Sequence, residues 1–572
     1  MDHGSLRSYR ETERDRLLWR RRLDRRRFMQ YAAAGLGVAG LTLACRGEEG
    51  APMATAPAEA RPPARGQGGT IVFRDVGDPG VFDYYKNWQY RSIQHLALVS
   101  PRLLKYKVGA DVGPLDYDVV PDLAVAMPEQ PDATTYIFKL RPARWENRPP
   151  VNGRPLTAED VVKNWDRFKA EHPNRTLLAD VQRVEAVAPD LVRFSLARPL
   201  GPFLAHMAHH GMFYVMPYEL FGTGQLDKDL WSAGPFLFRG YDVGAEARFE
   251  YNPDYFLVDR PYASRIVIRY LPDHSTFLSQ LRTRQIDAGL TTLSSLPSAK
   301  DLPELQRDLP SATYTRCPLL VDVMLHMDLR EPLFRDKRVR QAMSMAINRD
   351  DLGRISGEGV WALEYATLSR WYFDPKKNEF ANARNYQYNP SEARALLRAA
   401  GVERAGPYDL LIARYLWAEQ VEWAQYVQQQ LREVGIETRI KEVPFPEFAS
   451  QVVIGGRWNG GLALGQHLAG SDPNEYYTIL WTPGSPRLHS PGLEPLLRED
   501  QEMLDLLERQ RRELDPARRR EVIRQVVNTV ADRLYAIPLA VPVVYHVRQD
   551  NVELPWINSY GMEYAVEAWK RQ

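Results

Sequence analysis

The sequence predicts an α/β protein built around two separate hydrophobic cores. With 572 residues, of which 44% are hydrophobic and 26% charged, the chain exceeds one typical domain and has the composition of a globular protein. Strand-like stretches are followed or preceded by amphipathic helices in both halves of the chain. Aromatic and branched residues at 136–140 precede a helical pattern, and the helical pattern from Ala424 to Gly435 leads into a second strand.

The stretch at 136–168 carries the clearest local signals. Its first five residues are typical of a strand, and Asn152-Gly153 favours a turn with positive φ. Thr157 and Asp160 have the spacing of a capping box, which satisfies free N–H groups at the start of a helix. The apolar side chains that recur at helical spacing behind this cap are Val161, Val162, Trp165 and Phe168. We therefore expect a strand, a turn and a capped helix, with no catalytic group.

The N-terminal segment has the layout of an export signal. Its first 27 residues contain ten arginines, and the next 17 carry no charge, which makes the apolar part too short for a normal membrane span. Arg25, Arg26 and Phe28 resemble a twin-arginine motif, which implies export after folding. We predict a signal peptide at 1–44; the alternative is an uncleaved amphipathic helix.

Cys45 is the predicted lipid attachment point. Leu41-Thr42-Leu43-Ala44-Cys45 resembles a lipobox, and lipid on Cys45 would tether the protein to the membrane; cleavage without lipidation would give a free protein. Residues 45–69 are rich in Ala, Pro, Gly and Glu and are predicted to be a flexible linker. Removal of the signal would take away ten basic and five acidic residues, so the formal net charge would change from +1 to about −4. This balance does not suggest a nucleic-acid partner.

No cofactor and no metal are predicted. The run from Gly35 to Gly40 matches the dinucleotide fingerprint G-x-G-x-x-G, but it lies inside the export signal instead of a βαβ unit. His206, His209 and His210 have helical spacing, so two or three could face one metal. No neighbouring Cys or carboxylate in the sequence completes such a site, and packing or helix-end histidines are the favoured interpretation.

Several of these motifs, in order, resemble one known family. Tyr-x-Phe-x-Leu-Arg followed by Asn-Gly-x-Pro-Leu-Thr-Ala-Glu-Asp-Val-Val, at 136–162, resembles the signature of the family 5 extracellular solute-binding proteins. These are the peptide-binding and nickel-binding components of ABC importers. Residues 332–349 (PLFRDKRVRQAMSMAINR) and 388–401 resemble two further motifs of that family. The resemblance implies a two-lobed periplasmic-binding-protein-like fold of type II, class C, with an extra subdomain in the first lobe and a hinge between the lobes.

The resemblance also implies a division of the chain and a function. We expect residues 70–320 to form the first lobe, with the extra subdomain at about 111–215. Residues 321–536 would form the second lobe, and 537–572 would return to the first. The implied function is capture of a peptide or other small solute and its delivery to an inner-membrane ABC permease, by an exported, periplasmic or extracytoplasmic monomer.

Other functions remain open on the sequence. No G-x-S-x-G, H-E-x-x-H or Walker motif is present, so we predict that the protein is not an enzyme. The alternatives are an oligosaccharide-binding or modified-peptide-binding member of the same family, a sensory module that presents its ligand, and an exported hydrolase.

The run at 465–473 departs from the family at the position implied to bind the ligand. Peptide-binding members carry an aspartate there that pairs with the α-ammonium of the peptide, whereas this chain has Ala469, and Gln466 replaces a tryptophan. A buried ammonium without a partner costs about 3–5 kcal/mol. Either another carboxylate, Asp472 or Glu475, pairs with the ligand, or the ligand has no free amine.

Aromatic and polar side chains suggest where the pocket lies. The segment at 82–90 is dense in aromatic residues that could line a ligand pocket, although each could equally pack into the core. The predicted ligand-binding residues are Trp88, Tyr90, Trp231, Trp458, Gln466, His467 and Asp472.

Overall fold

The computed structural model describes residues 61–571 with short gaps, at 87–88, 110, 113–116, 292–293, 318–320, 362–370, 414–418, 454–455, 469–471, 486 and 556–560. The export-signal residues Arg25, Arg26 and Phe28, the lipidation site Cys45, and Trp88 lie outside the described residues. From Pro62 onward the chain forms one compact unit. Within the described part, no helix is long and apolar enough to span a membrane.

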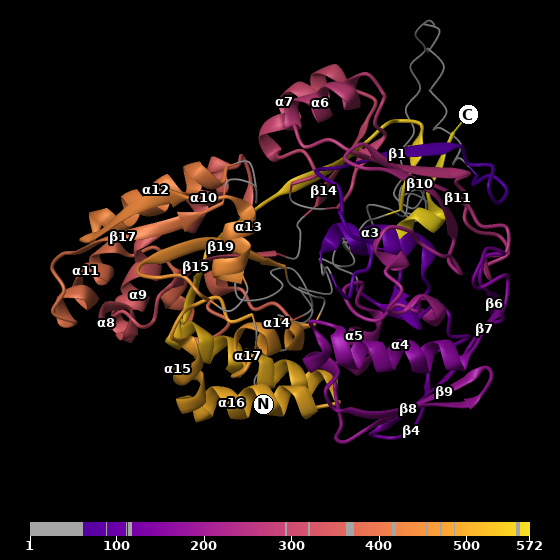
Figure 1. Cartoon of the computed structure of the whole chain (residues 1–572). Helices are drawn as coiled ribbons and strands as arrows, with labels where there is room; N and C mark the ends of the chain where they lie inside the picture. Colours follow the sequence, from indigo (N-terminus) through magenta and orange to yellow (C-terminus); the bar gives the residue numbers. More distant parts are fainter. Residues whose placement is uncertain are drawn as a thin grey trace, which may run out of the picture. The chain divides into compact units, whose positions relative to one another are not determined.

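The first lobe is built on a seven-stranded mixed sheet (Figure 1). Its order is β10 (Phe236–Asp242), β11 (Glu246–Tyr251), β12 (Arg265–Tyr270), β1 (Thr70–Asp75), β13 (Ala288–Gly289), β22 (Val544–Arg548) and β14 (Thr313–Cys317). β1 runs parallel to β12 and β13, whereas β22 runs antiparallel to β13 and β14. A strand from near the end of the chain, β22, therefore lies between β13 and β14, which precede it by more than 200 residues.

The first lobe also contains a four-stranded antiparallel sheet against which a helix packs. The strands are β4 (Glu129–Asp132), β5 (Thr135–Lys139), β9 (Leu191–Leu196) and β8 (Val181–Ala188), in that order, and the helix is α4 (Ala158–Glu171). The predicted strand, turn and capped helix are all confirmed. Asn152 and Gly153 have φ of 48° and 72°, and Thr157 and Asp160 form the capping box. Among the four apolar side chains predicted to be buried on this helix, Val161, Trp165 and Phe168 are buried and Val162 is partly exposed.

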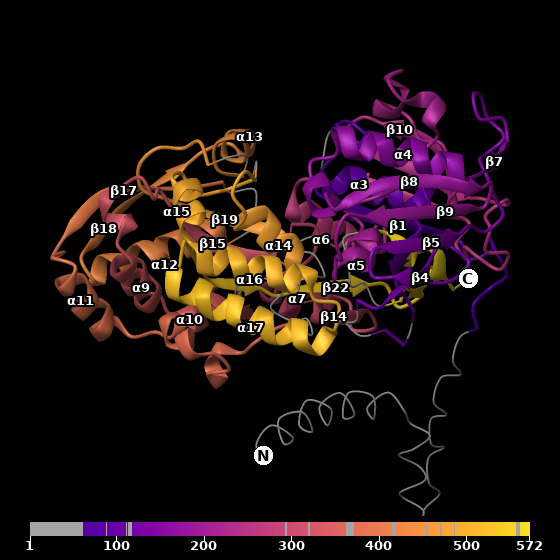
Figure 2. The ribbon, with the colours of Figure 1, turned by 90° about the horizontal axis from the view of Figure 1, so that it is seen from below.

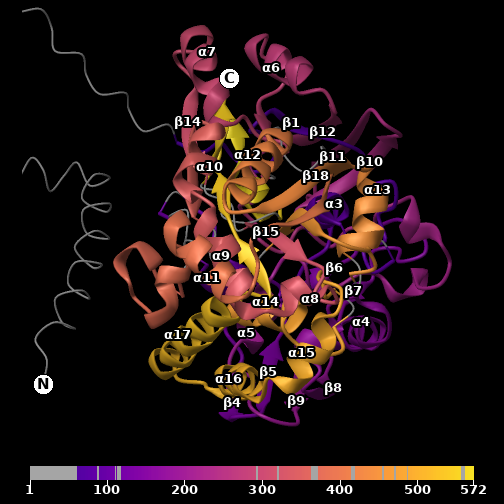
Figure 3. The same ribbon diagram turned by 90° about the vertical axis from the view of Figure 1, so that its left-hand side faces the viewer.

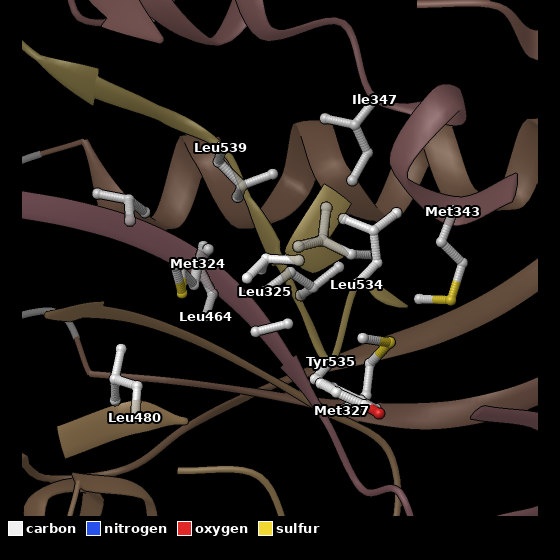
Figure 4. Packing of buried hydrophobic residues seen from close by; sticks show 14 of the residues in the cluster. Met324, Leu325, Met327, Met343, Ile347, Leu464, Leu480, Leu534, Tyr535 and Leu539 are labelled. Atoms are coloured by element: carbon white, nitrogen blue, oxygen red, sulfur yellow. The ribbon is translucent and has the colours of Figure 1, made fainter. Parts of the chain in front are cut away.

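The second lobe is built on a five-stranded sheet. Its order is β18 (Ile436–Glu442), β17 (Ala405–Ile412), β19 (Leu462–Leu468), β15 (Val321–Met327) and β20 (Ala536–Pro538). Residues 323–327 of β15 are buried on both faces of the sheet, as expected of a central strand. Met324 and Leu325 of β15 lie in one core with Leu464, Met343 and Leu534 (Figure 4).

Helices surround both sheets. In the first lobe these are α3 (Tyr90–Val99), α5 (Phe203–Ala208), α6 (His274–Arg282), α7 (Leu302–Asp308) and the short 3₁₀ turn η1 (Arg175–Leu178). In the second lobe they are α8 (Pro332–Arg335), α9 (Lys337–Ala346), α10 (Arg349–Ile355), α11 (Pro390–Ala399), α12 (Gln420–Glu433), α13 (Phe445–Phe448), α14 (Pro473–Leu480), α15 (Leu493–Glu499), α16 (Gln501–Arg512) and α17 (Pro516–Arg533). α16 and α17 run side by side (Figure 2), and α9 packs against both α11 and α17 (Figure 3).

In the described part of the chain, four small two-stranded sheets accompany the larger ones. The pairs are β2 (Leu104–Tyr106) with β3 (Val119–Pro121), β6 (Ala143–Arg144) with β7 (Pro155–Leu156), β16 (Gly359–Trp361) with β21 (Ala540–Pro542), and β23 (Val552–Glu553) with β24 (Trp569–Lys570). The buried apolar residues form one large core on each of the two main sheets and a smaller one under α6 and α7. The predicted two-lobed α/β fold with two large cores is thus confirmed.

Candidate functional site

The two lobes meet where the first turn of α14 faces the end of α5. Asn474 Nδ2 donates a hydrogen bond to His206 Nε2 at 3.0 Å. One residue further along α14, Glu475 Oε2 lies 3.4 Å from His209 Nε2. All four side chains are almost fully buried. Polar groups of the two lobes are therefore brought together away from water, which in proteins requires partners for each of them.

Asp472, at the N-cap of α14, is held by other residues of the second lobe. Both of its carboxylate oxygens accept hydrogen bonds from Arg519, each at 2.6 Å, and Oδ1 also accepts from the Asn474 backbone N–H at 2.9 Å. Burial alone would raise the pKa of Asp472, but Arg519 more than offsets this and holds the pKa below its usual value. Gln510 links the pair to the lobe junction, because its amide donates to Asn474 Oδ1 at 2.8 Å.

Glu475 is the second buried carboxylate of α14, and its environment differs from that of Asp472. Burial raises the pKa of Glu475 to about 8; the positive charge of Arg487 lowers it in part, and the negative charge of Asp472 raises it further. Burial in turn lowers the pKa of Arg487. A carboxyl group whose pKa stays raised beside an arginine has too little compensating positive charge around it.

The side chains of Tyr90, His209, Glu475 and Arg487 form a cluster at the junction, and its first-lobe side is aromatic. His209 Nδ1 accepts a hydrogen bond from the Gly211 N–H at 3.1 Å, so the ring proton of neutral His209 is on Nε2, toward Glu475. Burial lowers the pKa values of His209 and His210 well below the usual range, which keeps both rings neutral. The two rings lie 4.2 Å apart, and the ring of Tyr90 lies 5.9 Å from His210.

The predicted ligand residue at this cluster is Tyr90. It begins α3 and packs against the cores of both lobes. Gln466 and His467 belong to β19, where their backbones pair with β15. Their side chains lie outside the described part of the chain. β19 leads directly to Asp472 and α14, so these two positions and the cluster share one segment of the second lobe.

Trp231 and Trp458 are placed inside the two cores. The indole N–H of Trp231 donates to the Pro149 carbonyl at 2.9 Å, and Arg148 stacks on its ring at 4.0 Å. The indole N–H of Trp458 donates to the His489 carbonyl at 2.9 Å in the core of the second lobe. Both indoles therefore pack within their own lobes, and their ligand roles stay predictions.

No sequence pattern pointed to Arg487, and the histidines were predicted to serve packing or to lie at a helix end. Arg487 lies outside the helices and strands, after α14, where no periodicity marks it. His206 and His209 do pack, but against polar groups of the opposite lobe. Within the described ranges, no group of three or more His, Cys, Asp and Glu side chains is arranged to hold a metal ion.

A second contact between the lobes lies at the end of α16. Arg511 and Arg512 approach Asp180 Oδ2 at 3.0 and 2.7 Å, and Arg512 also donates to the Pro199 carbonyl at 3.0 Å. At Gly201, an added Cβ would lie 2.3 Å from the carbonyl oxygen of Glu513, so only glycine allows the two backbones to come this close. The junction is thus held at α16 as well as at α14.

Two α/β lobes that meet at buried polar groups form the architecture found in two-lobed solute-binding proteins. Residues 118–486 match the family described as bacterial extracellular solute-binding proteins, family 5 Middle, and the chain belongs to this family.

Individual relatives agree with this assignment. The dipeptide-binding protein of Escherichia coli K12 is 25% identical over 414 residues, which cover 67% of this chain and 72% of the relative. Two solved structures are similar over 88% of this chain and 99% of their own length. The periplasmic binding protein DppA of Helicobacter pylori, in complex with the peptide STSA, has a TM-score of 0.74 at 20% identity. AgaA of A. tumefaciens R10, in complex with agropinic acid, has a TM-score of 0.72 at 19% identity.

Proposed function

We propose that this protein is the substrate-binding component of an ABC importer, which captures a peptide or other small solute between its lobes and delivers it to a membrane permease. The observation that carries the proposal is the junction of α14 with α5, where Glu475 of the second lobe lies buried within 3.4 Å of His209 of the first. A ligand held there would contact both lobes, and its binding would favour their closed arrangement.

A ligand screen on the purified protein tests this proposal. Di- and tripeptides, opine-like conjugates of sugars and amino acids, and oligosaccharides would be added in thermal-unfolding experiments. A true ligand at 100 times its Kd should stabilise the protein by about 2.7 kcal/mol. Mass spectrometry of the protein as purified would identify any solute that stays bound. The proposal would be overturned if no compound stabilised the protein and no solute stayed bound on purification. Conversion of a bound compound to product would also overturn it.

A second class of ligand is favoured by one observation. AgaA, whose structure contains agropinic acid, has nearly the same similarity to this chain as the peptide-bound DppA. This similarity, together with Ala469 in place of the expected aspartate, supports sugar-containing and modified-peptide ligands as candidates alongside ordinary peptides. Competition between a dipeptide and an opine-like compound for the same site would rank the two classes.

We further propose that the protein works as an exported monomer anchored through lipid on Cys45. The proposal rests on the export-signal and lipobox patterns of the first 45 residues. Intact-mass measurement of the membrane fraction tests it, with Cys45→Ala as the matched control. Wild-type protein without a diacylglyceryl group, or equal membrane association of the two proteins, would overturn the anchor.

A further inference from the structure

We propose that the end of α16 forms a latch that closes the second lobe onto the first. The latch is the contact of residues 508–513 with residues 176–201. This inference rests on the proposed function, because a solute can be captured between two lobes only if they separate and close again. The latch adds a control of that movement, because its strength sets how readily the lobes part, whichever solute they bind.

Ion pairs form the first part of the latch. Asp180 lies between η1 and β8 in the first lobe, and its side chain is 5% exposed. From the second lobe, nitrogen atoms of Arg511 and Arg512 lie 3.0 and 2.7 Å from its Oδ2. Arg198 of the first lobe donates to Asp180 Oδ1 at 3.2 Å and also to Glu508 Oε1, across the junction, at 2.8 Å. Charged groups of each lobe are thus paired with groups of the other, and all of these partners belong to the protein itself.

Backbone contacts form the second part of the latch. The Gly201 N–H donates to the Arg511 carbonyl at 2.9 Å, and Arg512 donates to the Pro199 carbonyl at 3.0 Å. A Cβ added to Gly201 would lie 2.3 Å from the Glu513 carbonyl oxygen, closer than real Cβ atoms come to a backbone atom. The latch therefore has one close-fitting arrangement, and a methyl group at Gly201 would force the two segments apart.

The latch lies away from the segments that join the lobes. The chain passes from the first sheet to the second between β14 and β15, and it returns between β20 and β22. β14 lies above α14 and α5, whereas α16 lies below them (Figure 1 and Figure 3). Two bodies that rotate about their connections separate most at points far from those connections. Opening of the lobes about these strands must therefore break the latch.

The chemistry of the latch suits a contact that is made and broken. It consists of ion pairs and hydrogen bonds, and the side chains of Arg198 and Glu508 are 60% and 46% exposed. Water can replace these partners when the lobes part, whereas apolar surface would resist exposure. Interfaces between domains that move are likewise more polar than permanent ones. High salt should weaken the latch, because about 1 M salt reduces the range of electrostatic interactions to roughly 3 Å.

Two measurements on the full-length protein, without added solute, test the latch. Hydrogen exchange followed by mass spectrometry reports opening at the Gly201 N–H, and small-angle X-ray scattering reports the radius of gyration. Asp180→Asn removes the central carboxylate, and Gly201→Ala forces the two segments apart with every ion-pairing group in place. Arg198→Ala removes a side chain that is 60% exposed, so this variant should fold even if Asp180→Asn does not. Asp259→Asn, in an exposed ion pair within the first lobe, is the control.

We expect the Gly201 N–H to exchange about tenfold faster in Asp180→Asn than in the wild type, because exchange through opening follows the opening equilibrium. In Arg198→Ala it should exchange about two- to threefold faster. Asp180→Asn and Gly201→Ala should both have a larger radius of gyration, and Asp259→Asn should resemble the wild type. Salt at about 1 M should speed exchange in the wild type more than in Asp180→Asn.

The inference is overturned if none of the three latch variants has a larger radius of gyration than the wild type. Faster exchange at Gly201 with an unchanged radius would show a local contact that does not control opening, and would overturn it equally. Neither measurement depends on a ligand, so the latch can fail while the proposed function stands. Failure of the ligand screen would overturn the proposed function and leave the latch in place.

Discussion

Replacement of Asp472 by asparagine should lower the free energy of unfolding by about 3 kcal/mol. Breaking a buried ion pair by removing one partner costs about 3–5 kcal/mol. The lower value applies here because Arg519 would keep its hydrogen bonds to the backbone carbonyl and Oε1 of Gln510, at 2.9 and 3.0 Å. Asparagine can still cap α14, so the change removes the ion pair and leaves the cap.

Urea unfolding followed by fluorescence measures the effect, with Asp515→Asn as the control. Asp515 is the N-cap of α17 and accepts from the Arg518 N–H at 2.8 Å, so the same substitution there should cost only a few tenths of a kcal/mol. The pH dependence gives a second readout. Because the pKa of Asp472 is lowered in the folded protein, its stabilisation is present above the unfolded-state pKa of about 4 and is lost as pH falls through the folded-state value.

Asp472→Asn should therefore lose less stability than the wild type when the pH falls below about 4. Ligand affinity of the folded variant should be nearly unchanged. If Asp472→Asn costs less than about 1 kcal/mol of stability but abolishes ligand binding, then the assignment of Asp472 to a structural ion pair is wrong.

Three further predictions concern other buried groups. Asp160→Ala should destabilise the first lobe by about 3 kcal/mol, because Asp160 is fully buried, caps α4 and accepts two hydrogen bonds from Arg154 at 2.9 and 2.7 Å. Asp180→Asn should cost about 1–2 kcal/mol, less in high salt, because its arginine partners include the partly exposed Arg512. Cys317 should resist alkylation at pH 8 in the folded protein, because burial raises its pKa to about 12, and should react once unfolded in urea.

Each of these has its own control. Asp166→Ala, on the exposed face of the same helix, should cost far less than Asp160→Ala, and equal losses would contradict the cap and ion-pair argument. For Asp180→Asn the control is the exposed Asp259→Asn, and a loss that does not change between low and high salt would contradict the electrostatic account. Alkylation of folded Cys317 at the rate of a free thiol, read by mass spectrometry of its peptide, would contradict burial of the sulfur.

The sequence predicted local structure well and the junction poorly, for a physical reason. The strand, turn and capped helix at 136–168 depend on residues close together in the chain, and their signals survive without knowledge of the fold. The cluster at the junction combines Tyr90, His209, Glu475 and Arg487, which come from three distant segments. Sequence periodicity carries no information about which of these segments face one another.

Aromatic content was also an ambiguous guide to the pocket. Tyr90 does lie at the junction, whereas Trp231 and Trp458 satisfy their indole N–H groups on backbone carbonyls within the cores. The same side chain serves equally well for packing and for ligand contact, so only its neighbours decide its role. The predicted boundaries of the lobes at 320 and 536 stay predictions.

The place of β22 in the first sheet constrains the order in which the protein can fold. The strands of the second sheet occupy one continuous stretch, from Val321 to Pro538, and that sheet can form as soon as this stretch is available. The first sheet must wait, because β22 pairs with both β13 and β14 and is made after the entire second sheet. During synthesis β13 and β14 would therefore present open strand edges until β22 is made, and open edges are prone to wrong pairing. β22 completes the sheet to which β1 belongs, so removal of the segment that contains β22 should harm the first lobe before the second.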